Sequence, residues 1–177
     1  MTEEKYKWNY LNSDSAKPLF DIARKIILKN ECKSILDIGC GHSIISSYND
    51  DISIVGIDID KNAVAYCNNK YNGTYLEMDA VNNLSLDNLN MDFDCILLSG
   101  MLYYFKNNQF SITQTQFVDR LVKDFSPKLI VVTEPQDRKD YNSPDYSKFL
   151  KKYKPTSKTE LELDIRMGKR VVYEIKL

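Results

Sequence analysis

The feature that most restricts how this chain can fold is a regular alternation between short apolar runs and segments of helical spacing. The apolar runs, each typical of a buried strand, cover residues 34–38, 52–59, 73–80, 93–100 and 128–134. The segments with apolar residues at helical intervals cover 15–30, 61–71 and 108–125, and a short helix is expected at 43–48. Since parallel strands need a crossover connection, the alternation predicts a mostly parallel sheet with helices on both faces.

The pattern changes after residue 143, where a helix is expected. Two alternating runs then follow at 158–165 and 169–177, and Gly168 separates them. Such a pair is a hairpin signal, so we expect the last two strands to be antiparallel neighbours. The elements together predict an α/β fold, a three-layer α-β-α sandwich whose mostly parallel, seven-stranded sheet ends in an antiparallel β-hairpin. We expect one domain over 15–177, preceded by a short segment at 1–14.

The composition argues against several classes of protein. The 177-residue chain has a formal net charge of −1, which gives no sign of a nucleic-acid or anionic-membrane partner. No apolar run approaches the roughly 20 residues needed to cross a bilayer, and the N-terminus lacks the apolar region of a secretory signal. The four cysteines are scattered and there is one histidine, so neither a metal site nor a disulfide framework is expected. We expect a cytoplasmic protein with reduced thiols, no DNA partner and no membrane partner, and leave its oligomeric state open.

Two glycines directly follow the first predicted strand, in the stretch Ile-Leu-Asp-Ile-Gly-Cys-Gly-His-Ser at 35–43. Gly39 and Gly41, on either side of Cys40, lie where the chain leaves the strand. Glycine permits unusual backbone angles there and lets a ligand approach closely. A dinucleotide-binding turn would carry a third glycine at position 44, but that residue is isoleucine. The turn favours a ligand held against bare backbone without a pyrophosphate.

Two acidic residues stand at the ends of the next two predicted strands. Asp58 lies about 20 residues past the first glycine, where a carboxylate can accept both hydroxyls of a ribose. Asp79 can accept from the exocyclic amine of a nucleobase, and the alternative is that it caps the turn that follows. Asp60 is expected to cap the helix that begins at Lys61. The glycine turn and the two acids predict a pocket for a nucleoside without phosphates.

These residues resemble the motifs of the class I S-adenosylmethionine-dependent methyltransferases. The first motif of that family is similar to residues 36–43, the second to Val-Gly-Ile-Asp-Ile at 55–59 and the third to Glu-Met-Asp-Ala at 77–80. Residues 93–105 resemble the fourth motif, and 126–135 resemble the fifth strand. The resemblance covers nearly the whole chain from residue 16 onward, and it implies an enzyme that uses S-adenosylmethionine as its cofactor.

The resemblance also implies roles at the methionine end of the cofactor. The turn of Gly39, Cys40 and Gly41 would surround the methionine part. Asp37 would lie near its amino group, directly or through water. Ser99 and Gly100, which end the fourth strand, would contribute backbone next to the sulfonium.

At the adenosine end, the resemblance implies four more contacts. Asp58 would bind the ribose hydroxyls, and Ile59 would lie against the face of the adenine. Asp79 and the backbone of Ala80 would recognise the edge of the adenine.

Four residues are candidates for a catalytic role at the acceptor. Tyr103 and Tyr104 follow the fourth strand, where many family members carry a histidine, and aromatic rings there can shape a substrate pocket or attract a cation. Glu134, after the fifth strand, is expected either to point into the cleft and orient an amine or hydroxyl, or to lie in water. His42 is expected at a helix N-terminus, where the dipole disfavours its protonated form, so it is a candidate base or a loop residue beside the cofactor.

The motifs leave several hypotheses for the methyl acceptor. The leading hypothesis is methyl transfer to nitrogen or oxygen of a small-molecule substrate. The alternatives are an RNA or protein methyltransferase and a non-catalytic regulatory subunit that binds the cofactor; Ile44 argues against an NAD-binding oxidoreductase. Tyr6, Trp8 and Tyr10 alternate within 1–14, which predicts an aromatic gate over the site or a segment fixed to the sheet edge.

Overall fold

The computed structural model describes residues 16–48, 51–82, 89, 91–108, 110–137, 146–163 and 168–177. A seven-stranded sheet in the order β3-β2-β1-β4-β5-β7-β6 forms its centre. The strands are β1 (Ser34–Ile38), β2 (Ser53–Asp58), β3 (Thr74–Glu77), β4 (Cys95–Ser99), β5 (Leu129–Asp137), β6 (Ser157–Glu162) and β7 (Lys169–Lys176). Neighbouring strands are parallel from β3 to β5, and β7 is antiparallel to both β5 and β6.

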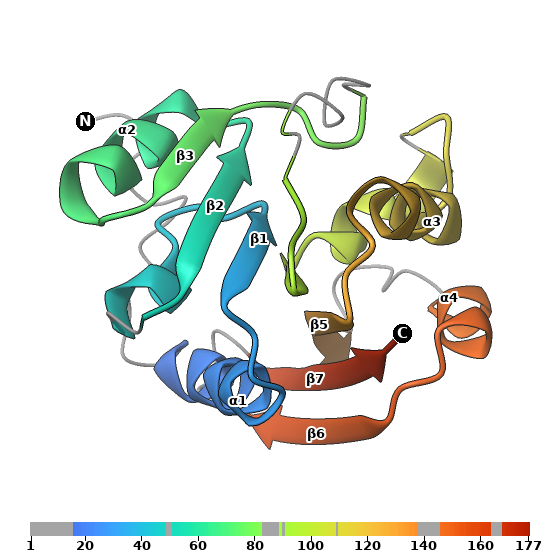
Figure 1. Cartoon of the computed structure of the whole chain (residues 1–177). Helices are drawn as coiled ribbons and strands as arrows, with labels where there is room; N and C mark the ends of the chain where they lie inside the picture. The colour runs from blue at the N-terminus through green and yellow to red at the C-terminus, as the bar shows by residue number, and fades with distance from the viewer. Residues whose placement is uncertain are drawn as a thin grey trace.

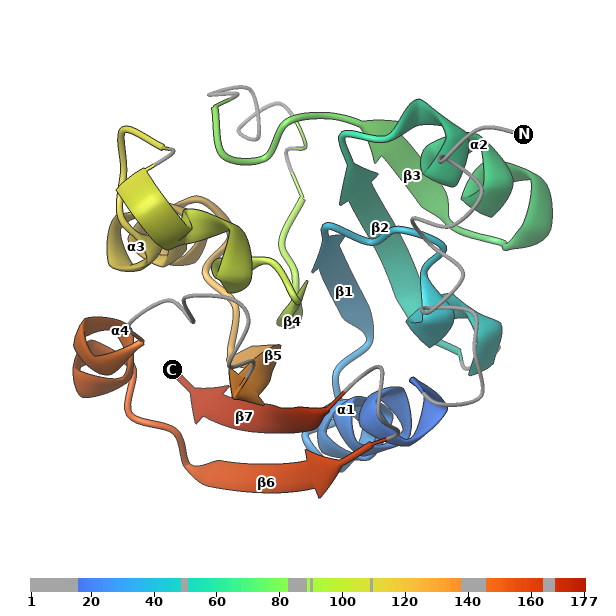
Figure 2. The same ribbon diagram turned by 180° about the vertical axis from the view of Figure 1, so that it is seen from behind.

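Helices cover both faces of this twisted sheet (Figures 1 and 2). They are α1 (Lys17–Lys29), the 3-10 helix η2 (Ile44–Tyr48), α2 (Lys61–Lys70), the 3-10 helix η4 (Leu102–Asn108), α3 (Gln114–Phe125) and α4 (Ser147–Lys152). On one face, Ile27 of α1 packs with Val131 and Val172 of the sheet. On the other face, Phe117 of α3 and Phe149 of α4 belong to a second apolar cluster. The predicted three-layer sandwich with a closing antiparallel hairpin is confirmed.

The central strands are apolar along their whole length because both of their faces are covered. In β4, the side chains from Cys95 to Leu98 are fully buried. β1 pairs with β2 on one side and with β4 on the other, so its carboxyl end lies in the middle of the sheet. The connections after β1 and β4 leave toward opposite faces, which opens a space at this end of the sheet.

Several predicted elements differ in extent, and two of these differences have a clear physical cause. The helix expected over 108–125 begins only at Gln114, as α3, because Thr113 caps it with a capping box. The Thr113 hydroxyl accepts from the Gln116 N–H, and the Gln116 side chain accepts from the Thr113 N–H. β5 continues beyond the predicted end at 134, because its antiparallel partner β7 pairs with it as far as Asp137.

Other expectations concern the termini and the thiols. The predicted gate at 1–14 lies outside the described residues. In the part of the chain that the structure describes, no helix is both long enough and apolar enough to cross a membrane. All four cysteines are free and buried: Cys32, Cys40, Cys67 and Cys95.

Candidate functional site

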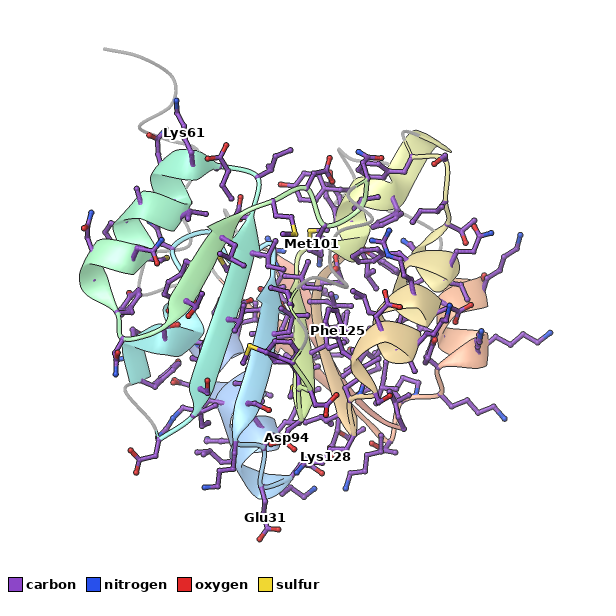
Figure 3. The ribbon with its side chains drawn as sticks, turned by 45° about the horizontal axis from the view of Figure 1, so that its top comes forward. Glu31, Lys61, Asp94, Met101, Phe125 and Lys128 are labelled. Atoms are coloured by element: carbon purple, nitrogen blue, oxygen red, sulfur yellow. The ribbon has the colours of Figure 1, made fainter. Side chains whose placement is uncertain are left out.

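A cavity of about 290 Å³ opens at the carboxyl ends of β1, β2 and β4. Its walls come from the turns after these strands, from the first part of α1 and from the end of β5. Met101, which follows β4, lies at this end of the sheet, whereas Asp94 and Lys128 lie at the opposite end (Figure 3). Ligands of open α/β sheets bind at the carboxyl ends of the strands, so this cavity is the candidate site.

The glycine turn predicted from the sequence forms one wall of the cavity. Gly39 has a φ of +71°, and a Cβ at this position would lie 2.8 Å from the side chain of Met101. Both the backbone angle and the lack of space therefore favour glycine. Cys40 lines the cavity as well, but Gly41 lies outside the lining, and its N–H donates to Asp58 at 2.8 Å. Gly41 thus positions a carboxylate of the site.

Asp37 is a buried carboxylate in the wall of the cavity. Only 2% of its surface is exposed, and burial raises its pKa to about 7. Oδ2 accepts a hydrogen bond from the Ser43 hydroxyl at 3.0 Å, whereas Oδ1 has no hydrogen-bond partner in the described part of the chain. A buried carboxylate oxygen without a donor is costly, so the site suits a ligand that brings a cationic N–H group to Oδ1.

Asp58 ends β2, and backbone groups hold both of its oxygens. Oδ2 accepts from the Gly41 N–H, and Oδ1 accepts from the Asp60 N–H at 2.9 Å. Each oxygen keeps a further lone pair for a ligand hydroxyl. Ile59 lines the cavity with 69% of its surface exposed, which presents an apolar face to a planar ring. Asp60 caps α2 by accepting from the Asn62 N–H, as predicted.

Asp79 and Ala80 follow β3 and line the same side of the cavity. The Asp79 carboxylate accepts from the N–H groups of Val81 and Asn82, each at 3.0 Å, so it caps the turn. Arg120 of α3 donates to the carbonyl oxygens of Ala80 and Val81. The turn is therefore fixed from within by Asp79 and from α3 by Arg120, and Asp79 still faces the cavity.

Ser99 and Gly100 end β4 and line the middle of the cavity. The Ser99 hydroxyl lies 2.9 Å from the hydroxyl of Thr133 in β5, and the Gly100 N–H donates to the Thr133 carbonyl oxygen at 2.7 Å. Gly100 has a φ of +66°, a backbone angle that favours glycine and turns the chain toward η4. These bonds to β5 fix the start of the segment that leads into η4, which contributes Tyr104 to the cavity wall.

The structure brings one of the two candidate tyrosines to the cavity. Tyr104 lines it with 47% of its surface exposed, whereas Tyr103 is half-buried and outside the lining. The two rings meet edge to face, with centroids 6.0 Å apart. Tyr103 therefore packs against Tyr104, which presents its ring to the site.

Glu134, predicted to lie in the cleft or in water, does neither. It is 1% exposed and outside the lining of the cavity. Oε1 accepts from the Leu102 N–H at 2.8 Å, and Oε2 accepts from the Tyr146 hydroxyl at 3.0 Å. Burial raises the pKa of Glu134 to about 8. The residue is thus a structural group at the start of η4, where its side chain accepts from a backbone N–H that has no partner within the helix.

The carbonyl oxygen of Leu102 is also held, since it accepts from the Gln114 amide of α3 at 3.0 Å. Leu102 is fully buried, and side chains from β5 and α3 thus bind both of its backbone groups. This clamp fixes the segment that carries Tyr104.

His42 lines the cavity and stacks on Tyr66 of α2, with ring centroids 4.2 Å apart. Burial lowers its pKa, which keeps the imidazole neutral. α2 covers β2 and β3, whereas η4 follows β4 on the other side of β1. His42 therefore belongs to the side of the cavity that Asp58 and Ile59 form.

Several lining residues belong to no motif that the sequence analysis uses. Leu19 and Phe20 come from the apolar face of α1, Phe110 precedes α3, and Arg170 comes from β7. Arg170 is 9% exposed and is the one lysine or arginine in the described lining. An arginine at the edge of the apolar run of β7 is the only sequence signal for its role.

Comparison with known protein families gives one match. The methyltransferase domain family matches residues 35–124, just over half of the chain. This span includes the glycine turn, the three acids at the strand ends and the whole of η4. No curated protein sequence matches the chain.

Solved structures with a similar fold include three methyltransferases. N-methyltransferase NodS from Bradyrhizobium japonicum WM9, in complex with S-adenosyl-L-homocysteine, has a TM-score of 0.75 and 12% identity, covering 99% of this chain and 92% of that chain. Magnesium protoporphyrin IX methyltransferase ChlM from Synechocystis PCC 6803, with S-adenosyl-L-homocysteine bound, has a TM-score of 0.71 and 11% identity over 92% and 84% of the two chains. The methyltransferase domain of bacterial CtHen1 has a TM-score of 0.68 and 13% identity over 93% and 100%.

These identities are too low to carry an acceptor from one protein to another, and the likeness shows the fold. The family match is independent of them and covers the residues that form the cavity. The resemblance stated from the sequence motifs is confirmed: this chain belongs to the methyltransferase domain family.

Proposed function

We propose that this protein transfers a methyl group from S-adenosylmethionine to a nitrogen or oxygen atom of a small-molecule acceptor. The observation that carries the proposal is the unpartnered, buried Oδ1 of Asp37 beside the glycine turn. S-adenosylmethionine carries an ammonium group on its amino-acid end, which is the kind of donor that this oxygen lacks. The related folds that bind S-adenosyl-L-homocysteine support the assignment.

The described residues fit this cofactor along its length. Asp37 would hold its ammonium group, and the backbone of Gly39, which lines the cavity, would lie beside the methionine part. Asp58 would accept from the ribose hydroxyls, and Ile59 would cover one face of the adenine. The cofactor supplies an electrophilic methyl group on a sulfonium. Ser99, fixed to β5, would hold the backbone beside that group.

The remaining lining of the cavity suits a small acceptor. Leu19 and Phe20 of α1, together with Tyr104 and Phe110, provide apolar and aromatic surface. Arg170 adds the one guanidinium of the described lining. We infer that the acceptor combines an apolar or aromatic body with an anionic group, since a guanidinium favours carboxylates and similar groups.

Among the described lining residues, no carboxylate or imidazole comes from η4 to take the proton of the acceptor. The carboxylates in the described lining, Asp37, Asp58, Asp60 and Asp79, belong to the ends of β1 to β3, and His42 stacks on α2. The nucleophilic atom therefore bonds to the methyl carbon as the carbon–sulfur bond breaks, and its proton leaves to solvent. This chemistry suits a neutral amine or an acidic hydroxyl, which the residues hold in line with the methyl group.

An RNA acceptor has weaker support. The lysines around α4 are exposed, and two of them already pair with acids. Lys152 lies 2.6 Å from Asp119, and Lys158 pairs with Glu160. Such a paired, solvated cluster gives little attraction for a phosphate backbone.

Calorimetry and a transfer assay together test the proposal. We expect wild-type protein to bind S-adenosylmethionine and S-adenosyl-L-homocysteine, and Asp37→Asn to weaken binding of both by at least about tenfold, because a charged partner is lost. Methyl-labelled cofactor and a cell extract separated by size should give a labelled product in the small-molecule fraction. Label in RNA or protein would instead show a macromolecular acceptor, and tight binding without any transfer would show a regulatory subunit. Absence of cofactor binding would refute the proposal.

A further inference from the structure

A chain of three hydroxyl groups leads to the carboxylate of Asp37. The Tyr75 hydroxyl of β3 donates to Oγ of Ser46 at 2.6 Å. The hydroxyls of Ser46 and Ser43 lie 2.7 Å apart, and Ser43 donates to Asp37 Oδ2 at 3.0 Å. Since the single proton of Ser43 goes to Asp37, the hydroxyl of Ser46 must donate to Ser43. All three O–H groups therefore point toward the carboxylate.

The sheet register explains why Tyr75 can reach this chain. Asp37 pairs with Gly56 of β2, and Gly56 pairs with Tyr75 of β3, so the three residues form one row across the sheet. A Cβ at position 56 would lie 2.4 Å from the Tyr75 ring. Because position 56 is glycine, the ring can lie across β2 and bring its hydroxyl to Ser46 of η2.

Ser43 and Tyr75 are buried, and Ser46 between them is half-buried. Ser43 is 1% exposed and Tyr75 is 3% exposed. Burial raises the pKa of Tyr75 to about 12, so its hydroxyl keeps its proton as a donor at neutral pH. In a low-dielectric interior, hydrogen bonds in one direction polarise each other, and the last of them is strengthened at the carboxylate.

We propose that Tyr75, Ser46 and Ser43 form a positioning relay that favours the ionised form of Asp37 and leaves its Oδ1 for the ammonium group of the cofactor. The inference rests on the proposed function and assigns to these three residues a role that no motif gives them. They act through Asp37, because the relay binds Oδ2 while Oδ1 has no hydrogen-bond partner among the described residues.

Several other ionisable groups face Asp37 and must be considered in its titration. Asp58 of β2 raises the pKa of Asp37 by repulsion. Cys40 of the glycine turn and Cys95 of β4 also lie within electrostatic reach. The side-chain interaction with Cys67, together with burial, raises the pKa of the Cys40 thiol, and burial raises the pKa of the Cys95 thiol, so both stay neutral. Among these groups, the relay is the one that favours the charged form of Asp37.

Tyr75 gives a selective test because it does not line the cavity that is proposed to hold the cofactor. Tyr75 and Ser46 line a second cavity of about 870 Å³ on the side of β2 and β3, and neither lines the cavity of the proposed cofactor. Tyr75→Phe removes one hydroxyl and keeps the ring that packs over Gly56. We therefore attribute an effect of this variant on cofactor affinity to the loss of the hydrogen bond from Tyr75 to Ser46.

The experiment measures affinity for S-adenosyl-L-homocysteine by calorimetry from about pH 5 to about pH 9. Ser43→Ala and Tyr75→Phe should move the midpoint of the pH dependence upward, by about one unit for Ser43→Ala and by less for Tyr75→Phe. At neutral pH, Ser43→Ala should then bind up to about tenfold more weakly. Ser47→Ala is the matched control: Ser47 is an exposed serine of the same 3-10 helix that donates to the Ile44 carbonyl oxygen and is not part of the chain.

A second measurement needs no cofactor. The carboxyl carbon of Asp37, followed by NMR in the free protein, should titrate at higher pH in Tyr75→Phe than in wild type. Unchanged titration in both Tyr75→Phe and Ser43→Ala, or an equal shift in Ser47→Ala, would overturn the relay. If Ser43→Ala does not fold, Tyr75→Phe decides alone. Failure of wild type to bind S-adenosyl-L-homocysteine would refute the proposed function, whereas the NMR titration would still test the relay.

Discussion

Glu134, in β5, accepts a hydrogen bond from the backbone N–H of Leu102, the first residue of η4, at 2.8 Å. The bond joins the fifth strand to the segment that carries Tyr104 into the cavity. Glu134 is almost fully buried, and burial raises its pKa to about 8. The wall of the proposed acceptor site is thus built on an acid that holds its proton near neutral pH.

Glu134→Gln should change how stability depends on pH. The folded pKa of about 8 lies above that of an unfolded glutamate, so at intermediate pH the folded state holds a proton that the unfolded state has lost. The wild type therefore loses stability as pH rises toward 8, by up to about 1.4 kcal/mol per pH unit. Glutamine can still accept from Leu102 but does not titrate. Urea unfolding at about pH 5 and pH 8 should show that the free energy of unfolding of the variant increases relative to that of wild type as pH rises. A difference between the two proteins that is the same at both pH values would contradict the raised pKa of Glu134.

Gly56→Ala should destabilise the fold by about 2 kcal/mol, because its Cβ would collide with the ring of Tyr75. The double variant Gly56→Ala/Tyr75→Ala removes the ring. Its loss of unfolding free energy should be smaller than the sum of the two single losses by at least about 1 kcal/mol. Denaturant titration of the four proteins measures this coupling. Additive losses would show that Tyr75 does not lie over position 56.

Asp58→Asn should weaken S-adenosyl-L-homocysteine binding by at least about tenfold, or about 1.4 kcal/mol. The carboxylate takes the N–H groups of Gly41 and Asp60 and is proposed to bind the ribose, whereas an asparagine offers only one acceptor oxygen. Asp92→Asn, at an exposed acid outside the cavity, is the control for loss of one negative charge. Equal affinities of the wild type and Asp58→Asn would remove Asp58 from the cofactor site.

Arg170→Met should remove preference for an anionic acceptor. With S-adenosyl-L-homocysteine bound, we expect wild type to bind benzoate more tightly than benzyl alcohol, and the variant to lose about tenfold in benzoate affinity alone. Lys169→Met, an exposed neighbour on the same strand, controls for net charge. Benzoate binding that is the same in Arg170→Met as in wild type would show that Arg170 does not contact the acceptor.

The order and type of the elements could be predicted from the sequence, because each strand is apolar enough to be read locally. The limits of helices were harder to predict, as the start of α3 at Gln114 shows. That start depends on the capping box of Thr113 and Gln116, a pair of side-chain bonds that periodicity does not reveal. β5 likewise extends past 134 because β7, far along the chain, pairs with it.

The candidate site was likewise predictable only in part. Asp37, Asp58 and Asp79 could be placed at the cavity because they end strands, and strand ends are visible in a sequence. The partners of these acids could not be predicted, since they come from the register between strands. Tyr75 joins the hydroxyl chain that ends at Asp37 because Gly56 leaves space for its ring. Arg170 reaches the cavity because β7 runs antiparallel to β5 and starts where β5 ends.

The two hydrogen bonds that fix the backbone of Leu102 have a consequence for how the substrate range of this protein can change in evolution. Its N–H and its carbonyl oxygen are bound by Glu134 and Gln114, neither of which lines the cavity. The main chain at this point is thus set without help from the side chain of Tyr104, nearly half of whose surface is open to solvent. Exchange of residue 104 can therefore alter which compounds fit while the backbone stays in register, so a new substrate range is reachable there by single substitutions.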